Sequence, residues 1–183
     1  MACTTTLPAT NFDDACPTIQ RGQVYKIYTT RATAVDELTD VEDLAEWTDR
    51  IDASAAVSDA ETPCAIREWS GIGSWGEGEV TDIDIPLDGI YSLPGNKVLT
   101  FKIYDLTVIN SAAFVAMRAA RSFKQKLWSA QDSTIWGGDA GIDGYMRADL
   151  IVPEGRAELQ YGQMTFTTKA GINAVTATPF PIL

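Results

Sequence analysis

Hydrophobic and polar positions change their spacing twice in the middle of the chain. Over Lys97–Tyr104 they alternate, which predicts a half-buried strand. Good helix formers occupy Ala112–Arg121, where Asn110 or Ser111 can cap a helix. Alternation returns over Ser122–Ser129. A short helix packed on a β-sheet is the simplest structure that accounts for all three patterns.

Alternation also predicts most of the remaining regular structure as strands. Thr39–Ile51 is the exception, because its apolar residues have the spacing of an amphipathic helix and Thr39 and Glu42 form a capping-box pattern. The other strands that we predict, rich in β-branched and aromatic residues, are Gln23–Thr30, Cys64–Trp69, Gly144–Val152 and Glu158–Lys169.

Two glycine-containing segments separate these elements. Ser70–Asn96 includes the turn dipeptides Asp88-Gly89 and Pro94-Gly95, and we expect it to form a long hairpin or loop arm that contacts a partner. Ala130–Asp143 predicts a second loop. Residues 1–21 and 170–183 show little periodicity, which predicts an extended N-terminal arm and an extended C-terminal tail.

Together these elements predict an α+β, mainly β fold: a β-sandwich or barrel with a packed helix, a long hairpin arm and extended termini. The 183 residues suit one domain, 1–183. No apolar run approaches the ~20 residues of a membrane helix. The first residues lack the basic and apolar sections of a secretory signal, so we expect a protein that does not cross a membrane by that route.

The charge of the chain narrows the classes of partner. With 14 basic and 25 acidic residues the net charge is -11, and tight phosphate binding needs the opposite balance. The protein is therefore a poor candidate for tight binding of nucleic acid, although nucleic acid can still pass along its surface. Cys3, Cys16 and Cys64 have no metal-site spacing, and we interpret them as reduced, small apolar residues, with a Cys3–Cys16 disulfide as the alternative.

The absence of histidine removes the commonest general base and metal ligand. Carboxylate pairs remain as candidates for glycoside cleavage, because tryptophans near them can stack on a sugar. Scattered acidic residues on solvated loops account for the same pattern. The candidate carboxylates are Glu68, Glu77, Glu79 and Asp82, and the candidate tryptophans are Trp69, Trp75, Trp128 and Trp136.

Two acidic loops are weak candidates for a bound cation. One carries Asp82, Asp84 and Asp88, and the other carries Asp139 and Asp143. Neither has the spacing of an EF-hand, and turn chemistry accounts for both.

The glycines at positions 71, 73, 76 and 78 match a dinucleotide fingerprint in spacing only. No amphipathic helix follows them, and the acidic residues that do follow would repel a pyrophosphate. We therefore interpret these glycines as part of a flexible hairpin arm. We expect no cofactor.

The order of these elements resembles that of the tail-tube proteins of bacteriophages and of the related ring proteins of contractile injection systems. The resemblance covers most of the chain. It rests on five stretches, of which the last two are the long strands near the C-terminus. They are Gln23–Thr30, Ser70–Asn96, Lys97–Arg121, Gly144–Val152 and Glu158–Lys169.

This resemblance implies a non-enzymatic virion protein of the tail, assembled in the host cytoplasm. Its subunits would stack as hexameric rings around a channel, and DNA would pass without specific binding. Its partners would be further copies of itself and other tail or head proteins, with no membrane. The predicted subunit interface consists of arm residues and a basic cluster: Trp75, Val80, Ile83, Ile85, Leu87, Tyr91, Arg118, Arg121, Lys124 and Lys126.

Two other functions remain open at this point. A capsid-decorating, head-to-tail connector or adaptor protein would bind a larger partner and assemble little with itself. A carbohydrate-binding or glycan-cleaving module would use the tryptophans named above.

Overall fold

The structure is a computed structural model, and it describes nine stretches of the chain. These are residues 23–53, 63–76, 81–85, 89–93, 95–119, 123–131, 134–154, 159–169 and 177–179. The predicted N-terminal arm and most of the predicted C-terminal tail lie outside these residues.

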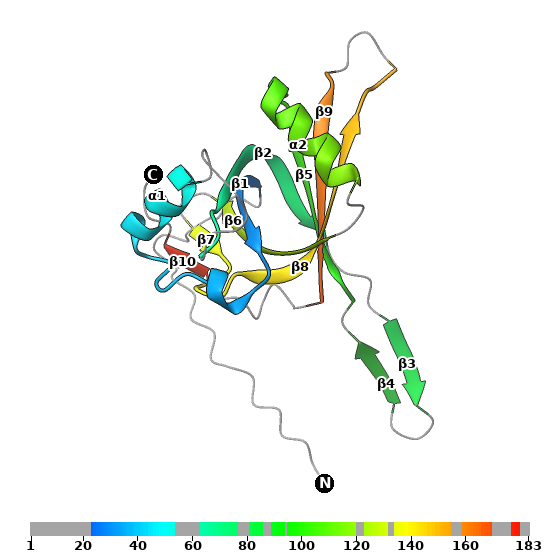
Figure 1. The fold of residues 1–183 in the computed structure, drawn as a ribbon. Coiled ribbons are helices and arrows are strands. Elements are labelled where there is room, and N and C mark those ends of the chain that lie inside the picture. The colour runs from blue at the N-terminus through cyan, green and yellow to red at the C-terminus, as the bar shows by residue number, and fades with distance from the viewer. Residues whose placement is uncertain are drawn as a thin grey trace, which may run out of the picture.

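Six antiparallel strands form a closed barrel (Figure 1). Neighbouring strands pair in the order β1, β2, β5, β9, β8 and β6, and β6 pairs back onto β1 from Lys26↔Ala130 to Arg31↔Gln125. The mainly β prediction is confirmed, and the fold is a barrel. The barrel strands are β1 Val24–Arg31, β2 Arg67–Gly76, β5 Lys97–Ile103, β6 Phe123–Gln131, β8 Ile142–Ile151 and β9 Tyr161–Thr168.

Four strands and two α-helices lie outside this closed ring. β7 Thr134–Trp136 extends the sheet beside the end of β6, and β10 Ala177–Pro179 pairs with β7. β3 Thr81–Ile85 and β4 Gly89–Leu93 pair only with each other and lie away from the barrel in Figure 1. The helices are α1 Leu44–Ala53 and α2 Val108–Ala119, with a short 3₁₀ helix at Ala34–Asp36.

The barrel interior holds the first hydrophobic core. Every second residue of β5 and β9 points into it, as the alternation predicts: Leu99 and Phe101 are buried on β5, and Met164 and Phe166 are buried on β9. Phe114 of α2 joins this core and contacts Trp69 edge-on, with ring centroids 6.0 Å apart. Helix α2 therefore covers one end of the barrel and inserts an aromatic ring into it.

A second core lies on the outside of β1 and β6, where α1 and the 3₁₀ segment cover them. Trp47 of α1 contacts Tyr28 and Trp128, with ring centroids 4.9 Å and 5.6 Å away. On β6, Leu127 faces the first core, and Lys126 and Trp128 face the opposite side, as the alternation predicts. All three are buried, because β6 separates the two cores.

Helix α1 begins five residues later than the sequence pattern predicts. Asp43 caps it by accepting a hydrogen bond from the Ala45 N–H (2.9 Å), so the predicted capping box of Thr39 and Glu42 is wrong. The N–H of Thr39 donates instead to the carboxylate of Glu46. Residues 39–43 are thus held as a non-helical lead-in by acidic side chains.

Helix α2 begins earlier than predicted and is capped by a different residue. The hydroxyl of Thr107 accepts a hydrogen bond from the Asn110 N–H (3.2 Å), so Asn110 and Ser111 lie inside the helix. Phe114 faces the first core, whereas Arg121, the last residue of the predicted helix, lies outside the described residues.

The first seven residues of the predicted arm Ser70–Asn96 belong to the barrel. They continue β2 to Gly76, which pairs with Val98 of β5. A Cβ atom at Gly71 would overlap the carbonyl oxygen of Lys102 and lie 2.8 Å from the Phe101 ring. The glycine lets β2 approach β5 with an aromatic ring beneath it, so this part of the segment is not a flexible arm.

The predicted loop Ala130–Asp143 also contains strand residues, because β6 runs to Gln131, β7 lies within the segment and β8 begins at Ile142. The turn between β7 and β8 lies against Trp128, whose indole N–H donates to the carbonyl of Gly138 (2.7 Å). Gly137 has a φ of 142°, and a Cβ atom there would overlap the Trp128 ring. The packing of this indole therefore explains Gly137, and a positive φ of 56° accounts for Gly138.

Candidate functional site

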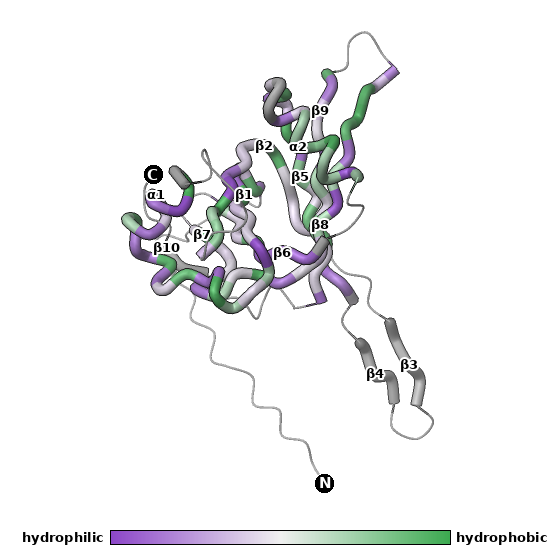
Figure 2. The backbone as a smooth tube through the Cα atoms, viewed as in Figure 1, coloured by the Kyte–Doolittle hydropathy of each residue, from purple (hydrophilic) through white to green (hydrophobic). Residues whose placement is uncertain are grey.

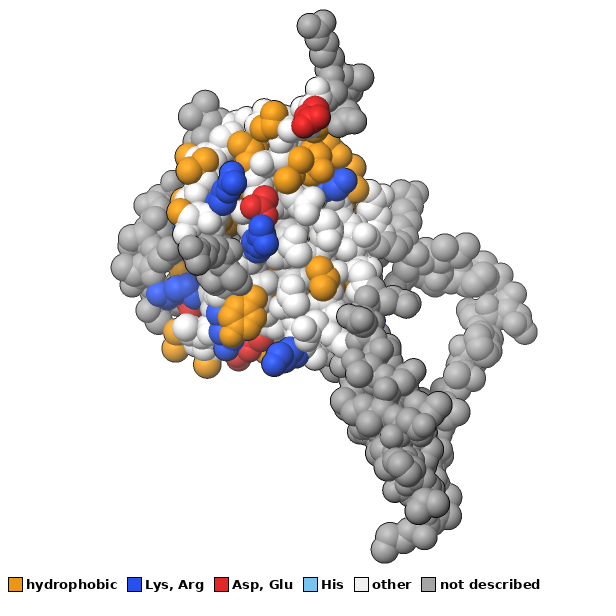
Figure 3. All heavy atoms as spheres, turned by 90° about the vertical axis from the view of Figure 1, so that its right-hand side faces the viewer, with side chains coloured by type: hydrophobic (Ala, Val, Ile, Leu, Met, Phe, Trp, Pro, Cys, Tyr) orange, Lys and Arg blue, Asp and Glu red, His pale blue; other side chains and the backbone are white. Residues whose placement is uncertain are grey.

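One side of the barrel is not buried by the second core, and we call it the open face. Its residues are outward-pointing positions of β2, β5, β9 and β8, all exposed or half-buried. They are Ser70, Ile72, Ser74, Val98, Thr100, Lys102, Tyr145, Arg147, Asp149, Tyr161, Gln163, Thr165 and Thr167. The open face ends at its borders with β1 and β6, where Glu68 pairs with Lys26 and Asp143 pairs with Lys126. Figure 3 views this side of the molecule, where uncharged polar surface predominates between scattered charges.

The open face is almost neutral in a strongly acidic chain. It carries two basic residues, Lys102 and Arg147, and one acidic residue, Asp149. Arg147 and Asp149 form an ion pair with an N–O distance of 3.0 Å, and the Lys102 ammonium lies 4.9 Å from the centre of the Tyr161 ring. The remaining side chains are mostly hydroxyl or amide groups, which present neither a cluster of carboxylates nor a cluster of free cations.

An apolar patch lies at one end of the open face, beside the β8–β9 connection. Val152 and Leu159 are 68% and 72% exposed, and Tyr104 contacts Tyr161 with ring centroids 5.7 Å apart. Figure 2 shows hydrophobic residues at the end of β8 away from the barrel, and Figure 3 shows hydrophobic side chains gathered at this end. Patches of this kind mark interaction surfaces. The sequence pattern does not reveal this one, because its residues lie at the ends of three predicted strands, and Tyr104 is far from the other two in the sequence.

Four residues of the predicted subunit interface have described side chains, and these four do not lie together on one surface. Trp75 is half-buried inside the barrel, where its indole N–H donates to Ser129 (3.2 Å), and Arg118 and Lys124 are exposed. The fourth is Lys126, whose side chain is buried. The side chains of the other six members are not described: these are Val80, Ile83, Ile85, Leu87, Tyr91 and Arg121. For Ile83 and Tyr91 the backbone register is known, since they pair across the β3–β4 hairpin.

Lys126 is engaged inside its own chain. Its ammonium is almost fully buried and lies 3.0 Å from the Glu37 carboxylate, 3.4 Å from that of Asp143 and 2.8 Å from the carbonyl oxygen of Ala140. It thereby connects the segment before α1 to the turn before β8. Lys126 therefore has a structural role within the chain, whereas Lys124, its neighbour in the predicted basic cluster, is exposed.

Asp139 and Asp143, the acidic residues of the second predicted cation loop, make contacts within the chain. Asp139 accepts a hydrogen bond from the Val41 N–H (2.8 Å), and Asp143 pairs with Lys126. Among the described residues no group of three or more potential ligands is placed to hold a metal ion. Of the first predicted loop, Asp82 and Asp84 lie in β3 without described side chains, and Asp88 lies outside the described residues.

Two of the tryptophans proposed for sugar stacking are interior residues. Trp69 and Trp128 are buried in the first and second core, and their indole N–H groups donate to Thr29 (3.2 Å) and Gly138. Glu68, the one candidate carboxylate with a described side chain, pairs with Lys26 at 2.9 Å. Glu77 and Glu79 lie outside the described residues.

A buried polar network anchors the layer that covers β1 and β6. The Arg50 guanidinium donates to the carbonyl oxygens of Cys64, Asp36 and Glu37, at distances from 2.9 to 3.2 Å. Burial lowers the pKa of Arg50, against the opposing effect of the charges of Glu46 and Asp36. The network connects α1 with the segments on either side of it.

The carboxylate of Asp36 is the acceptor at the centre of this network. Burial by itself raises the pKa of Asp36, but hydrogen bonds from Thr33, the Cys64 N–H (2.6 Å) and Arg31 (3.3 Å) outweigh it and lower the pKa. Folding therefore favours the charged form, so its stabilisation is present above the unfolded pKa of about 3.9 and is lost as the pH falls through the lower folded pKa.

We expect Asp36→Asn to lower the free energy of unfolding by about 3 kcal/mol at pH 7, because it leaves buried donors without a charged acceptor. Below about pH 4 the difference between wild type and variant should shrink. Urea unfolding from pH 7 to pH 3 measures both. Asp49→Asn, on the exposed side of α1, should change the pH 7 value by less than about 0.5 kcal/mol. A constant difference at every pH would contradict this role of Asp36.

Comparison of the chain with protein-family models, with curated proteins and with solved structures finds no match. Among the described helices, none has the length and apolar character needed to cross a membrane.

Proposed function

We propose that this protein is a structural subunit that assembles into rings, stacked as a tube through which DNA passes in a virion tail. The observation that carries the proposal is the open face, which is almost neutral and rich in hydroxyl groups although the chain has a net charge of -11. Basic clusters on a channel wall would hold DNA by releasing its counterions, and dense acidic clusters would repel it. A wall of short, uncharged polar side chains does neither.

The two sides of the barrel have different roles in this proposal. The outer surface of β1 and β6 is occupied by α1 and by the Trp47–Trp128 core. The open face is the broad remaining surface of the barrel sheet, and we assign it to the channel wall. In this arrangement the channel wall would be close to neutral although the chain as a whole is acidic.

Two features of the chain support contacts between subunits. The β3–β4 hairpin forms a two-stranded sheet of its own, and an isolated hairpin is at best marginally stable in water, so a neighbouring subunit would stabilise it. The apolar patch at Val152 and Leu159 would lose its contact with water if another ring lay on it. We therefore assign the hairpin to lateral contacts and the patch to stacking.

Light scattering after size exclusion tests the proposal. The full-length chain should elute as a multi-chain species. Replacing residues 78–95 by a short Gly-Asn turn should yield a monomer with a folded barrel, because the last β2–β5 pair, Gly76↔Val98, is retained. Leu159→Asp should suppress stacking and leave single rings, while Thr167→Ser on the open face should assemble normally. An unchanged oligomer after removal of the hairpin would contradict its role, and a monomeric wild type would favour a connector or adaptor protein.

A further inference from the structure

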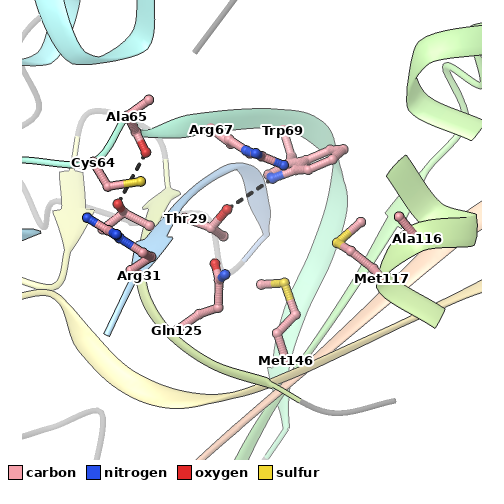
Figure 4. A pocket seen from close by; sticks show the side chains of 11 residues that line it. Thr29, Arg31, Cys64, Ala65, Arg67, Trp69, Ala116, Met117, Gln125 and Met146 are labelled. Atoms are coloured by element: carbon pink, nitrogen blue, oxygen red, sulfur yellow. Dashed lines mark hydrogen bonds between the residues drawn. The ribbon is translucent and has the colours of Figure 1, made fainter. Parts of the chain in front are cut away.

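A pocket of about 250 Å³ lies between α2 and the barrel, at the end where β1 and β2 meet the first residues of β6 (Figure 4). Its floor is buried and its rim is exposed: Trp69 and Met146 are buried, whereas Ala116 and Arg67 are exposed. An apolar cavity of about 150 Å³ can bind benzene, so this one has room for a somewhat larger molecule. It is distinct from the open face.

The apolar wall of the pocket comes from three elements. Met117 of α2 and Met146 of β8 face each other across the space, and Trp69 of β2 closes one side (Figure 4). Trp69 is fixed, since its indole N–H donates to Thr29 and its ring contacts Phe114. Thioethers are adaptable in shape, so this wall suits a flexible hydrocarbon chain.

The polar side chains that line the pocket carry hydroxyl, thiol, amide or guanidinium groups. Arg31 and Arg67 contribute guanidinium groups, and Gln125 contributes an amide. None of the lining residues is acidic, although the chain has 25 acidic residues. A guanidinium N–H of Arg31 donates a hydrogen bond to the Asp36 carboxylate (3.3 Å). This bond fixes the position of the Arg31 side chain beside the pocket. The lining therefore complements an anion, and the apolar wall complements a hydrocarbon chain attached to it.

We propose that this pocket binds a small amphipathic anion, a medium-chain carboxylate, with its acyl chain between Met117, Met146 and Trp69 and its carboxylate at Arg67. The bound molecule would contact both α2 and the barrel, and so stabilise the packing of α2 on the end of the barrel that it covers. This inference rests on the pocket alone and does not depend on the proposed tube function.

Calorimetric titration of the full-length protein with octanoate, and with octanol as the uncharged comparison, tests the proposal. We expect saturable binding of octanoate. Arg67→Gln should weaken octanoate binding about tenfold, because it removes one charge-assisted contact, and should change octanol binding by less than about twofold.

Two tryptophan substitutions on α2 distinguish binding in the pocket from non-specific binding elsewhere on the protein. Ala116→Trp places a large ring in the pocket and should abolish binding of both ligands. Val115→Trp adds the same ring at a neighbouring position that is 63% exposed and does not line the pocket, and it should bind like the wild type. Absence of octanoate binding, or equal binding by the Ala116→Trp and Val115→Trp variants, would overturn the proposal. Equal weakening of octanoate and octanol by Arg67→Gln would overturn the assignment of the carboxylate.

Discussion

Replacing Gly71 by alanine should lower the free energy of unfolding by about 3 kcal/mol or more, measured by urea titration. The new methyl group would overlap the carbonyl oxygen of Lys102, a backbone atom that cannot move without separating β2 from β5. It would also press on the Phe101 ring, which is fully buried in the barrel. We therefore expect the substitution to disrupt the pairing of β2 with β5 at this position.

Gly76→Ala, in the same strand, is the matched control. A Cβ atom there would lie 3.3 Å from the nearest neighbouring atom, the carbonyl oxygen of Val98, which is close but requires only a small adjustment. Its cost should stay below about 1 kcal/mol. Equal effects of the two substitutions would show that the close approach of Lys102 and Phe101 does not require a glycine at position 71, which would contradict the packing described for β2.

Replacing Trp47 by alanine should remove about 4 kcal/mol of stability, the usual cost of a large buried aromatic residue. The indole contacts Tyr28 and Trp128, and its N–H donates to the carbonyl oxygen of Val41 (2.9 Å). Urea unfolding measures the loss, and near-ultraviolet circular dichroism should report the changed environment of the remaining aromatic rings.

Two further substitutions define what Trp47 contributes. Trp47→Phe keeps an aromatic ring and loses the hydrogen bond, so its cost should be intermediate, about 2 kcal/mol. Leu44→Ala, at a half-exposed position on the same helix, should cost less than about 1 kcal/mol, although the sequence pattern includes Leu44 in the apolar stripe. A loss below about 1 kcal/mol for Trp47→Ala would show that the second core does not hold α1 on the barrel.

Alternation predicted the inner faces of β5 and β9, because each of these strands has one face in the barrel core and one partly open to solvent. On β6 alternation also put Leu127 and Trp128 on opposite faces, but it could not show that both faces are buried, Leu127 in the barrel and Trp128 in the second core. The helices were predicted in the right places with the wrong first residues. Their ends depend on which side chain caps them, and Asp43 and Thr107 lie one residue before each helix.

Glycine was the most misleading signal in the sequence. Gly71 and Gly73 are two residues apart and point to the same face of β2, both against Phe101. Their spacing is that of a strand, but a glycine beneath an aromatic ring looks the same in sequence as a glycine in a turn. The partner that distinguishes the two lies in a different strand.

The open face was only partly predictable. Its polar positions on β9 follow from alternation, yet their grouping with β2, β5 and β8 depends on the long-range pairing that closes the barrel between β1 and β6. The apolar patch depends on the same arrangement, since it combines Tyr104, after β5, with residues on both sides of the β8–β9 connection. Neither surface is contiguous in sequence.

Electron cryo-microscopy of the full-length protein at high concentration decides whether the chain assembles into a tube. We expect rings or stacked tubes with a central channel, in which the outward side chains of β2, β5, β9 and β8 line the wall and α1 lies on the outside. Single, unassembled chains would contradict the tube proposal. Rings whose channel is lined by α1 would keep the assembly and contradict the role given to the open face.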